Sequence, residues 1–448
     1  MEFNILSVVL FLIFLKLLFF WLWLWQLKEY RSDRFLANFK GGQAIRKIFS
    51  SLWWPKYPKF TKKIIVVAFT SLLLAILMLL KGFYLAIFLL IVLVPLFFQI
   101  PTVIWRKGFF KKARLKREGF KNLTVIGITG SYGKSSTKEF LYTMLSEKYG
   151  KEKVLKTEGN INTEIGVADT VLKKLNNNHK FFICEMGAYK RGEIRTACNI
   201  VKPKIGVLTG INEQHLELFG SQENIIKGKF ELIENLPEDG TAFFNAKNKY
   251  CLELHNETLR LRSGQAQFKN FLYGQEARIF GEENLLGAIA VARELGVEID
   301  PELYLKKGLP AVRRGINGLN IIDSTYSANP TGVIAHLEYL KTLRQARGKL
   351  IIVMPCLIEL GEASKEVHRR IGGKIGEVCD LAIITTKDRF EEIKETAGDK
   401  AIFLESPQDI FDKIKSATQA GDVVLLESRV HDSLQSTNQL ISLLVVSD

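Results

Sequence analysis

Long apolar blocks near the start of the chain give way to short apolar runs farther along. The first block covers residues 5–25 and contains one charged residue, Lys16. The second block comprises residues 64–80 and 83–104, which a Lys-Gly pair separates. Because an α-helix needs about 20 apolar residues to cross the hydrocarbon of a bilayer, this pattern predicts three membrane-spanning helices over these ranges.

Short β-branched runs alternate with amphipathic helical patterns, such as those at 135–148 and 284–295, in the rest of the chain. That alternation is typical of α/β proteins with mostly parallel sheets. The Gly-Leu-Pro sequence at 308–310 predicts a turn, which we take as the boundary between two α/β domains. The expected strands are residues 123–128, 181–184, 205–208, 350–353, 381–384 and 423–426. The expected regions are a membrane region over 1–107, a central domain over 108–310 and a C-terminal domain over 311–448.

The excess of basic residues lies in the apolar part of the chain. The whole chain has a formal net charge of +15, with 62 Lys and Arg against 47 Asp and Glu. Residues 1–120 hold 19 of these basic residues and 4 of the acidic ones, so the remainder is formally neutral. A basic groove for nucleic acid is therefore not expected on the folded body, and we predict no nucleic-acid partner.

Two basic stretches flank the apolar segments. Residues 26–63 carry ten Lys and Arg, and residues 106–117 carry seven. Because cytoplasmic loops are enriched in Lys and Arg, we expect a multi-pass membrane protein with its amino terminus outside and its α/β body in the cytoplasm. The first four residues carry no positive charge and no small-residue cleavage pattern follows, so a cleaved signal peptide is not expected. The charge favours either retention in the bilayer or contact with anionic lipid or a lipid-linked substrate.

The cysteines show no CxxC pair and no histidine at metal-ligand spacing. They are Cys184, Cys198, Cys251, Cys356 and Cys379. We expect reduced, mostly buried thiols, which excludes a disulfide framework and a zinc site.

A glycine loop follows the first predicted strand. Five residues separate Gly127 from Gly133, one more than the strict phosphate-loop spacing allows. The loop still supplies backbone N–H groups for phosphate, a lysine cation and a hydroxyl for Mg²⁺. A structural turn with a chance lysine is the alternative. The predicted ATP-binding residues of this loop are Gly130, Ser131, Gly133, Lys134, Ser135 and Ser136.

The loop sequence TGSYGKSST at 129–137 resembles the ATP loop of the Mur ligases, which add peptides to cell-wall precursors. Segments in family order then resemble the branch that adds D-alanyl-D-alanine. They are residues 157–166, 181–194, 209–221 and 323–330. The resemblance covers about residues 121–430 and implies a P-loop-type Mur ligase central domain followed by a Rossmann-like C-terminal domain. It also implies an ATP-dependent, ADP-forming amide-bond ligase of peptidoglycan synthesis.

The resemblance assigns a catalytic role to Lys134, His215 and Lys229. It implies two Mg²⁺ ions, with metal-binding positions at Ser135, Glu185, His215 and a carbamylated Lys229. Lys227 is the alternative carbamylation site. Glu185 ends a predicted strand, where open α/β sheets place ligand-binding groups.

Further positions follow from the same resemblance. For nucleotide they are Asn284, Arg314 and Asn329, and for the acceptor substrate they are Thr157, Asn160 and Asn162. The chain departs from the family pattern at several positions. These departures are Thr163 for Asn, Glu283 for His, Pro355-Cys356 for Gly-Asp, and Leu426-Glu427-Ser428-Arg429 for a Lys-Gly-Ser-Arg signature.

The resemblance implies that a substrate carboxylate takes the γ-phosphate of ATP and that an amine then displaces phosphate from the acyl phosphate. The partners would be a muramoyl peptide and an amino-acid or dipeptide amine, which for this branch is D-Ala-D-Ala. Ordinary members begin with a soluble domain that binds the UDP part of the precursor, where this chain has apolar segments. A lipid-linked acceptor and an inactive membrane-anchored nucleotide-binding scaffold therefore stay open as alternatives.

Overall fold

The computed structural model describes residues 5–27, 30, 35, 53, 56–261, 269–277, 281–301, 303–304, 312–325, 328–343, 348–428 and 434–445. The chain forms two compact units, Met1–Lys111 and Lys112–Asp448. The boundary expected at residues 308–310 lies outside the described residues.

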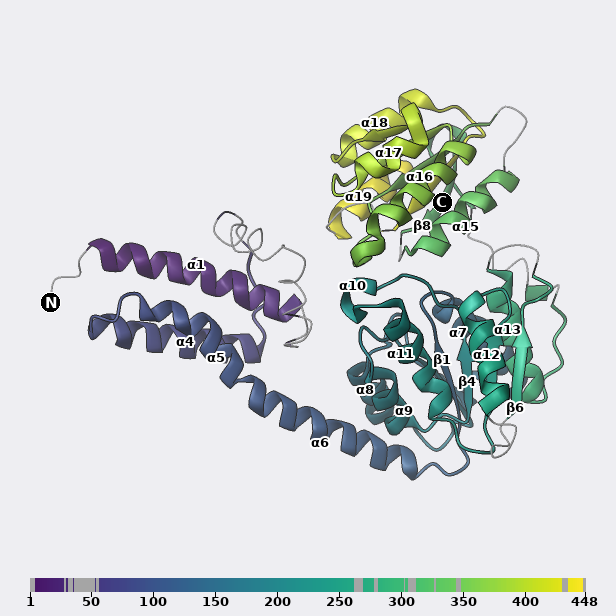
Figure 1. Cartoon of the computed structure of the whole chain (residues 1–448), viewed down its shortest axis with the longest axis horizontal. Coiled ribbons are helices and arrows are strands. Elements are labelled where there is room, and N and C mark those ends of the chain that lie inside the picture. Colours follow the sequence, from purple (N-terminus) through teal and green to yellow (C-terminus); the bar gives the residue numbers. More distant parts are fainter. Residues whose placement is uncertain are drawn as a thin grey trace. The chain divides into compact units, whose positions relative to one another are not determined.

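Helices make up the described part of the first unit (Figure 1). They are α1 (Ile5–Leu27), α4 (Lys62–Leu80), the 3-10 turn η1 (Ala86–Leu89), α5 (Leu90–Phe97) and α6 (Gln99–Glu118), which continues into the second unit. The candidate membrane spans are Ser7–Leu27, Lys62–Leu80 and Ala86–Glu118, which are long and apolar enough by length and composition.

The third apolar segment differs in detail from the expected helix over 83–104. After α4, Gly82 turns the chain with a φ of 79°, and residues 83–85 stay outside a helix. Pro95 lies inside α5, where it removes a backbone donor. The third candidate span thus begins at Ala86, three residues later than expected, and continues to Glu118.

The helices of the first unit pack through one apolar face and expose another. Phe14 and Leu18 of α1 are fully buried and share a cluster with Ile64 of α4 and Ile87 of η1. On the outer face, large apolar side chains such as Phe69, which is 67% exposed, have no protein cover. A face of this kind is stable in lipid and unfavourable in water.

The second unit contains two six-stranded sheets. The first sheet has the order β2-β3-β1-β4-β5-β6, and all of its strands are parallel. Its strands are β1 (Thr124–Thr129), β2 (Val154–Lys156), β3 (Phe181–Glu185), β4 (Ile205–Leu208), β5 (Thr241–Asn245) and β6 (Lys269–Tyr273). Its helices are α7 (Lys134–Tyr149), α8 (Glu164–Lys174), α9 (Glu193–Val201), α10 (Leu216–Phe219), α11 (Gln222–Glu234), α12 (Lys249–Leu261) and α13 (Glu282–Glu294).

Helices cover both faces of the first sheet, with α8, α9 and α11 on one side and α7, α12 and α13 on the other (Figure 1). Ile126 and Ile128 of β1 pack with Leu141 of α7 and Ile289 of α13 in one core. Burial on both faces explains why these strands read as continuous apolar runs in the sequence.

The second sheet has the order β11-β10-β9-β12-β8-β7 and is parallel except for the edge strand β7. Its strands are β7 (Val312–Arg314), β8 (Asn320–Ser324), β9 (Leu350–Met354), β10 (Leu381–Ile384), β11 (Ala401–Phe403) and β12 (Val423–Glu427). Its helices are α15 (Pro330–Leu343), α16 (Ser364–Val378), α17 (Phe390–Ala397), α18 (Pro407–Ala417) and α19 (Leu434–Leu444). The expected α/β class with mostly parallel sheets is confirmed.

The strand order fixes where ligands can bind in the first sheet. Strand β1 lies between β3 and β4, so the chain that leaves β1 and the chain that leaves β4 diverge at their carboxyl ends. Ligands of open α/β sheets bind in the crevice at such a point. The glycine loop after β1, Glu185 at the end of β3 and the turn after β4 all lie at this edge.

A buried ion pair joins α15 to β12 in the second sheet. His336 Nδ1 lies 2.6 Å from Glu427 Oε2, and Glu427 is fully buried. Burial alone would lower the pKa of His336, but the hydrogen bond and charge of Glu427 outweigh it and raise that pKa. Glu427, one of the departures from the family pattern, thus has a structural partner.

The raised pKa makes this pair stabilising at low pH. Its contribution is complete below the unfolded histidine pKa of about 6.5 and disappears as the pH rises through the folded value. We expect His336→Gln, which keeps a neutral donor, to destabilise the second unit by about 1–2 kcal/mol at pH 5.5 and by less at pH 8.5. Urea unfolding of the full chain followed by circular dichroism measures this. A difference that stays constant with pH would contradict the assignment.

Candidate functional site

Two glycines of the loop after β1 are fixed by close packing. Gly133 has a φ of 80°, and a Cβ at this position would overlap the amide oxygen of Asn284. A Cβ at Gly130 would overlap the hydroxyl of Thr209. The loop is therefore a close-fitting cradle of backbone that only glycine permits at these two positions.

The lysine and serines of the loop face different groups. Lys134 Nζ donates to the carbonyl oxygens of Gly130 at 2.8 Å and Ser131 at 3.1 Å, and burial lowers the pKa of Lys134. Ser131 is buried, donates its N–H to Gly210 and accepts from the N–H of Asn212. Ser136 is exposed on the first turn of α7. Ser131 thus connects the loop to the turn after β4, whereas the Lys134 side chain bonds back to carbonyl oxygens of its own loop.

Glu185 is the centre of a buried polar cluster. Its side chain is almost fully buried and accepts from Ser135 Oγ at 2.9 Å, Lys138 Nζ at 3.0 Å and Asn162 Nδ2 at 3.1 Å. The structure therefore brings together Ser135 of the loop, Glu185 of β3 and Asn162 of the expected acceptor segment.

Lys138 is a member of this cluster that the sequence reasoning missed. Its side chain is fully buried, and Nζ also donates to the carbonyl oxygen of Gly159 at 2.7 Å. Lys138 follows Ser135 by three residues, so both side chains lie on one face of α7. That spacing was the available signal, but a lysine in an amphipathic helix ordinarily faces solvent.

The expected acceptor residues fall into two groups. Thr157 is fully buried, and its Oγ1 accepts from the N–H of Glu185 at 3.0 Å. Asn162 holds the Glu185 carboxylate, whereas Asn160 is exposed. Thr163, which replaces the usual asparagine, caps α8 by accepting from the N–H of Gly166. Thr157 and Asn162 of this segment thus contact Glu185, whereas Asn160 is exposed to solvent.

The two candidate lysines on α11 are in different environments. Lys229 is 2% exposed, and its Nζ donates to the carbonyl oxygen of Ala188 at 3.3 Å. Lys227 is exposed and pairs with Glu223 one turn earlier. Burial, followed by the charge of Lys134, lowers the pKa of Lys229 to about 7. Lys229 is therefore the buried lysine whose pKa is affected by the charge of Lys134 in the loop.

His215 follows β4, and its pKa is also affected by the charges of Lys229 and Lys134. Its ring packs on Tyr189 with 4.5 Å between ring centroids, and Nδ1 lies 2.5 Å from Glu359 Oε2. Burial lowers the pKa of His215, and although Glu359 raises it, Lys229 and Lys134 lower it further. The ring is thus neutral near pH 7, which is the form that ligates metals.

Asn284 lies at the start of α13 with its side chain almost fully buried. Its Oδ1 has no hydrogen-bond partner among the described residues and lies against Gly133. Glu283, where the family pattern has histidine, turns back and accepts from the N–H of Gly281 at 2.8 Å. Burial raises the pKa of Glu283. This buried, unpaired amide oxygen beside the glycine loop is available to accept a hydrogen bond from a bound ligand.

The residues expected from the second sheet are placed unequally. Asn329 caps α15 and accepts from Asn212 Nδ2 at 2.9 Å, and Thr331 accepts from the same amide at 2.9 Å. Arg314 is exposed on β7, and no described hydrogen bond links it to the loop. Arg429 lies outside the described residues. Asn329 is thus connected to the first sheet through Asn212.

Comparison with known proteins identifies this arrangement. Residues 128–290 match the Mur ligase middle domain, and residues 311–429 match the Mur ligase glutamate ligase domain. The chain belongs to the Mur ligase family. The fold and the ATP-dependent ligase class that the sequence predicted are confirmed.

Two curated relatives carry the same name. The UDP-N-acetylmuramoyl-tripeptide--D-alanyl-D-alanine ligase of Bacillus subtilis is 29% identical over 350 residues, which are 71% of this chain and 75% of that protein. The Synechocystis enzyme of the same name is 28% identical over 340 residues, covering 68% of this chain and 72% of its own.

Two solved structures share the fold. The MurF ligase of Thermotoga maritima in complex with ADP has a TM-score of 0.61 at 26% identity and covers 75% of this chain and 82% of its own. MurF of Acinetobacter baumannii has a TM-score of 0.64 at 23% identity and covers 75% and 80%, which shows the fold alone.

The residues present fit the nucleotide and metal of a Mur ligase. Backbone groups of the loop, the unpaired oxygen of Asn284 and the cation of Lys134 suit a nucleotide. No three His, Cys, Asp or Glu side chains cluster as a metal site within the described residues. Mg²⁺ is commonly held by one or two carboxylates together with substrate phosphates, so Glu185 and Ser135 satisfy its requirement without a protein cage.

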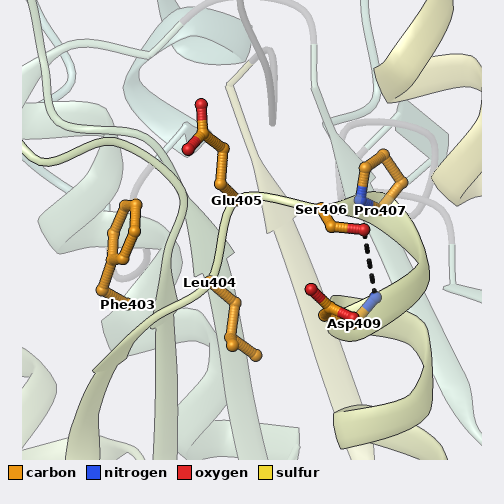
Figure 2. Close-up of a pocket in the computed structure, with 6 residues that line it drawn as sticks. All are labelled: Phe403, Leu404, Glu405, Ser406, Pro407 and Asp409. Atoms are coloured by element: carbon orange, nitrogen blue, oxygen red, sulfur yellow. Dashed lines mark hydrogen bonds between the residues drawn. The ribbon is translucent and has the colours of Figure 1, made fainter.

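Two cavities of this Mur ligase are not lined by the Glu185 cluster. Figure 2 shows one of about 520 Å³ beside β11 and the start of α18, where Ser406 Oγ caps the helix through the N–H of Asp409. It contains none of the predicted site residues. The other, of about 680 Å³, is lined by Asn212 and Tyr250 on one side and by Thr331 and Arg370 on the other. This second cavity adjoins the hydrogen bonds that connect Asn329 to the first sheet.

The position of Lys138 gives a stability prediction. Lys138→Met leaves the Glu185 carboxylate and the Gly159 carbonyl without their buried donor, so we expect a loss of about 3–5 kcal/mol, the usual cost of breaking a buried ion pair. ADP affinity should fall at least tenfold. Urea unfolding and an ADP titration measure the two effects. The exposed Lys151→Met is the matched control and should stay within about 0.5 kcal/mol; equal stability of the two variants would contradict the prediction.

Proposed function

We propose that this Mur ligase adds D-Ala-D-Ala to a muramoyl peptide in peptidoglycan synthesis, with release of ADP and phosphate. The observation that carries the proposal is the Glu185 cluster, in which one carboxylate contacts the nucleotide loop through Ser135 and the acceptor segment through Asn162. Relatives that share this fold are named for the same reaction. ATP and the acceptor would thus meet at the edge where β1, β3 and β4 end.

The reaction follows from groups at this edge. An acceptor carboxylate oxygen bonds to the γ-phosphorus of ATP as the bond to ADP breaks, and the amine of the dipeptide then displaces phosphate and loses a proton. Lys134 offsets negative charge on the transferring phosphoryl group. Bound Mg²⁺ would supply further charge neutralisation, held by Ser135 and Glu185, with His215 and Lys229 as further positions. Asn284, Arg314 and Asn329 are the proposed nucleotide contacts, and Thr157, Asn160 and Asn162 the acceptor contacts.

Carbamylation of Lys229 is part of the proposal. A buried ammonium beside Lys134 is unfavourable, and burial together with that neighbouring charge lowers the pKa of Lys229 to about 7. The neutral amine can attack CO₂, forming an N–C bond and losing a proton, which converts a cation into a carboxylate-like group. The exposed Lys227 has no such driving force because Glu223 already pairs with it.

We further propose a multi-pass membrane protein with membrane lipid as a partner, an outside amino terminus and a cytoplasmic body. The apolar exposed face of the first unit and the basic stretches at 26–63 and 106–117 support this arrangement. The proposed regions are the membrane region 1–107, the central domain 108–310 and the C-terminal domain 311–448. A membrane anchor also favours a second candidate, in which the acceptor is a lipid-linked muramoyl peptide.

A product-mass experiment tests the ligase activity. The detergent-solubilised chain is incubated with ATP, Mg²⁺, D-Ala-D-Ala and either a UDP-linked or a lipid-linked muramoyl peptide. We expect one acceptor to gain the mass of D-Ala-D-Ala less water, with one ADP released per product. Lys134→Ala and Lys229→Ala should each lower turnover at least a hundredfold, whereas Lys227→Ala should retain it. ATP binding without product from either acceptor would instead support the inactive scaffold.

Cysteine labelling in intact cells tests the topology. All five native cysteines are buried, so background labelling is low. A membrane-impermeant maleimide should label Lys81→Cys in intact cells, because the turn after α4 faces outward. Lys59→Cys and Lys112→Cys, which are also exposed positions, should be labelled only after lysis. Labelling of Lys112→Cys in intact cells would contradict a cytoplasmic body.

A further inference from the structure

Glu359 of the second sheet domain contacts His215 of the first. The Glu359 carboxylate lies 2.5 Å from His215 Nδ1, and the Glu359 carbonyl oxygen accepts from the N–H of Glu217 at 3.1 Å. Both side chains are about three-quarters buried, with 25% and 23% of their surface exposed. The contact joins residues 144 positions apart in the chain.

The loop that carries Glu359 is held from both ends. Before Glu359, Leu357 donates its N–H to Nε2 of the buried His368 at 2.9 Å, and Cys356 donates its N–H to Thr386 at 2.8 Å. After Glu359, the backbone of Gly361 packs against Glu217. Glu359 itself has a φ of 63°, a left-handed conformation that a glutamate adopts only when its surroundings impose it. The loop therefore presents this carboxylate in one fixed place.

The contact determines the tautomer of His215. A carboxylate accepts only from a protonated ring nitrogen, so Nδ1 carries the hydrogen of the neutral ring and Nε2 carries the lone pair. Ligating histidines are commonly oriented in this way by a carboxylate on their other nitrogen. The ring also packs against Tyr189 with a tilt of 56° between the ring planes, so the two contacts together restrict the direction of Nε2.

We propose that Glu359 is a positioning residue through which the second sheet domain orients His215 for a divalent cation bound with the nucleotide. This inference rests on the proposed function, because it takes His215 as a metal-binding position. It means that a complete metal site requires contact between the two sheet domains. A nucleotide bound to the first sheet alone would then hold its cation weakly.

Mn²⁺ binding tests this role without turnover. Free Mn²⁺ is followed by electron paramagnetic resonance as the ion is added to the full chain with ADP. We expect Glu359→Gln to weaken Mn²⁺ binding about 10–100-fold, the usual effect of losing such an orienting group, while ADP affinity in the absence of metal changes less than threefold. Glu366→Gln, an exposed carboxylate on α16, is the matched control and should leave Mn²⁺ affinity unchanged. Glu359→Gly, which tolerates the left-handed backbone, replaces Glu359→Gln if that variant does not fold.

A double variant separates positioning from an independent role. If Glu359 acts through His215, the pair His215→Ala and Glu359→Gln should bind Mn²⁺ no more weakly than His215→Ala alone. Additive losses, or Mn²⁺ affinity of Glu359→Gln within twofold of the unchanged chain, would overturn the inference. Those results leave the ligase proposal intact if product still forms. Absence of Mn²⁺ binding by the unchanged chain would overturn the inference and the proposed metal site together.

Discussion

The structure of the site depends on providing hydrogen-bond and ion-pair partners for the buried carboxylate of Glu185. The strand that ends at Glu185 is buried along its whole length, and a carboxylate there is unfavourable unless it is paired and hydrogen-bonded. Lys138, Ser135 and Asn162 supply that pairing from the helix after the loop and from the acceptor segment. Because Ser135 and Lys138 come from α7 and Asn162 comes from the acceptor segment, satisfying one carboxylate also brings the nucleotide loop and the acceptor segment together.

A second constraint is the set of basic side chains that lie beside this cluster. Burial lowers the pKa of Lys134, Lys229 and His215, and the charge of Lys134 lowers the pKa of Lys229 and of His215 further. A bound phosphate anion would favour the protonated forms of these side chains, so the site is suited to a nucleotide. Carbamylation of Lys229 would remove one of these charges. The same arrangement then accommodates Mg²⁺ as well as phosphate, which agrees with the ligase chemistry of the family.

The sequence predicted those elements that a local pattern determines. Short apolar runs predicted β1, β3, β4, β9, β10 and β12 but not the interior strands β5 and β8, and the resemblance to the Mur ligases pointed to Glu185. The edge strand β6, whose residues alternate between exposed and partly buried before the buried Tyr273, was not predicted. Lys138 was missed because burial of a helical lysine depends on tertiary partners. Glu359 was missed because its contact with His215 spans 144 positions. The position of Arg314 on an exposed edge strand was also not predictable, because it depends on which strands pair in the folded sheet.

The distribution of charge explains how the two units can serve one reaction. The body is formally neutral beyond residue 120, so it gains little long-range attraction to an anionic membrane. In the proposed arrangement, proximity to the bilayer comes from the apolar helices and their flanking basic residues. Tethering replaces free encounter by a high local concentration of a membrane-bound acceptor, without any new contact in the site. In that arrangement a lipid-linked substrate would benefit from the tether, whereas a freely diffusing UDP-linked substrate would not.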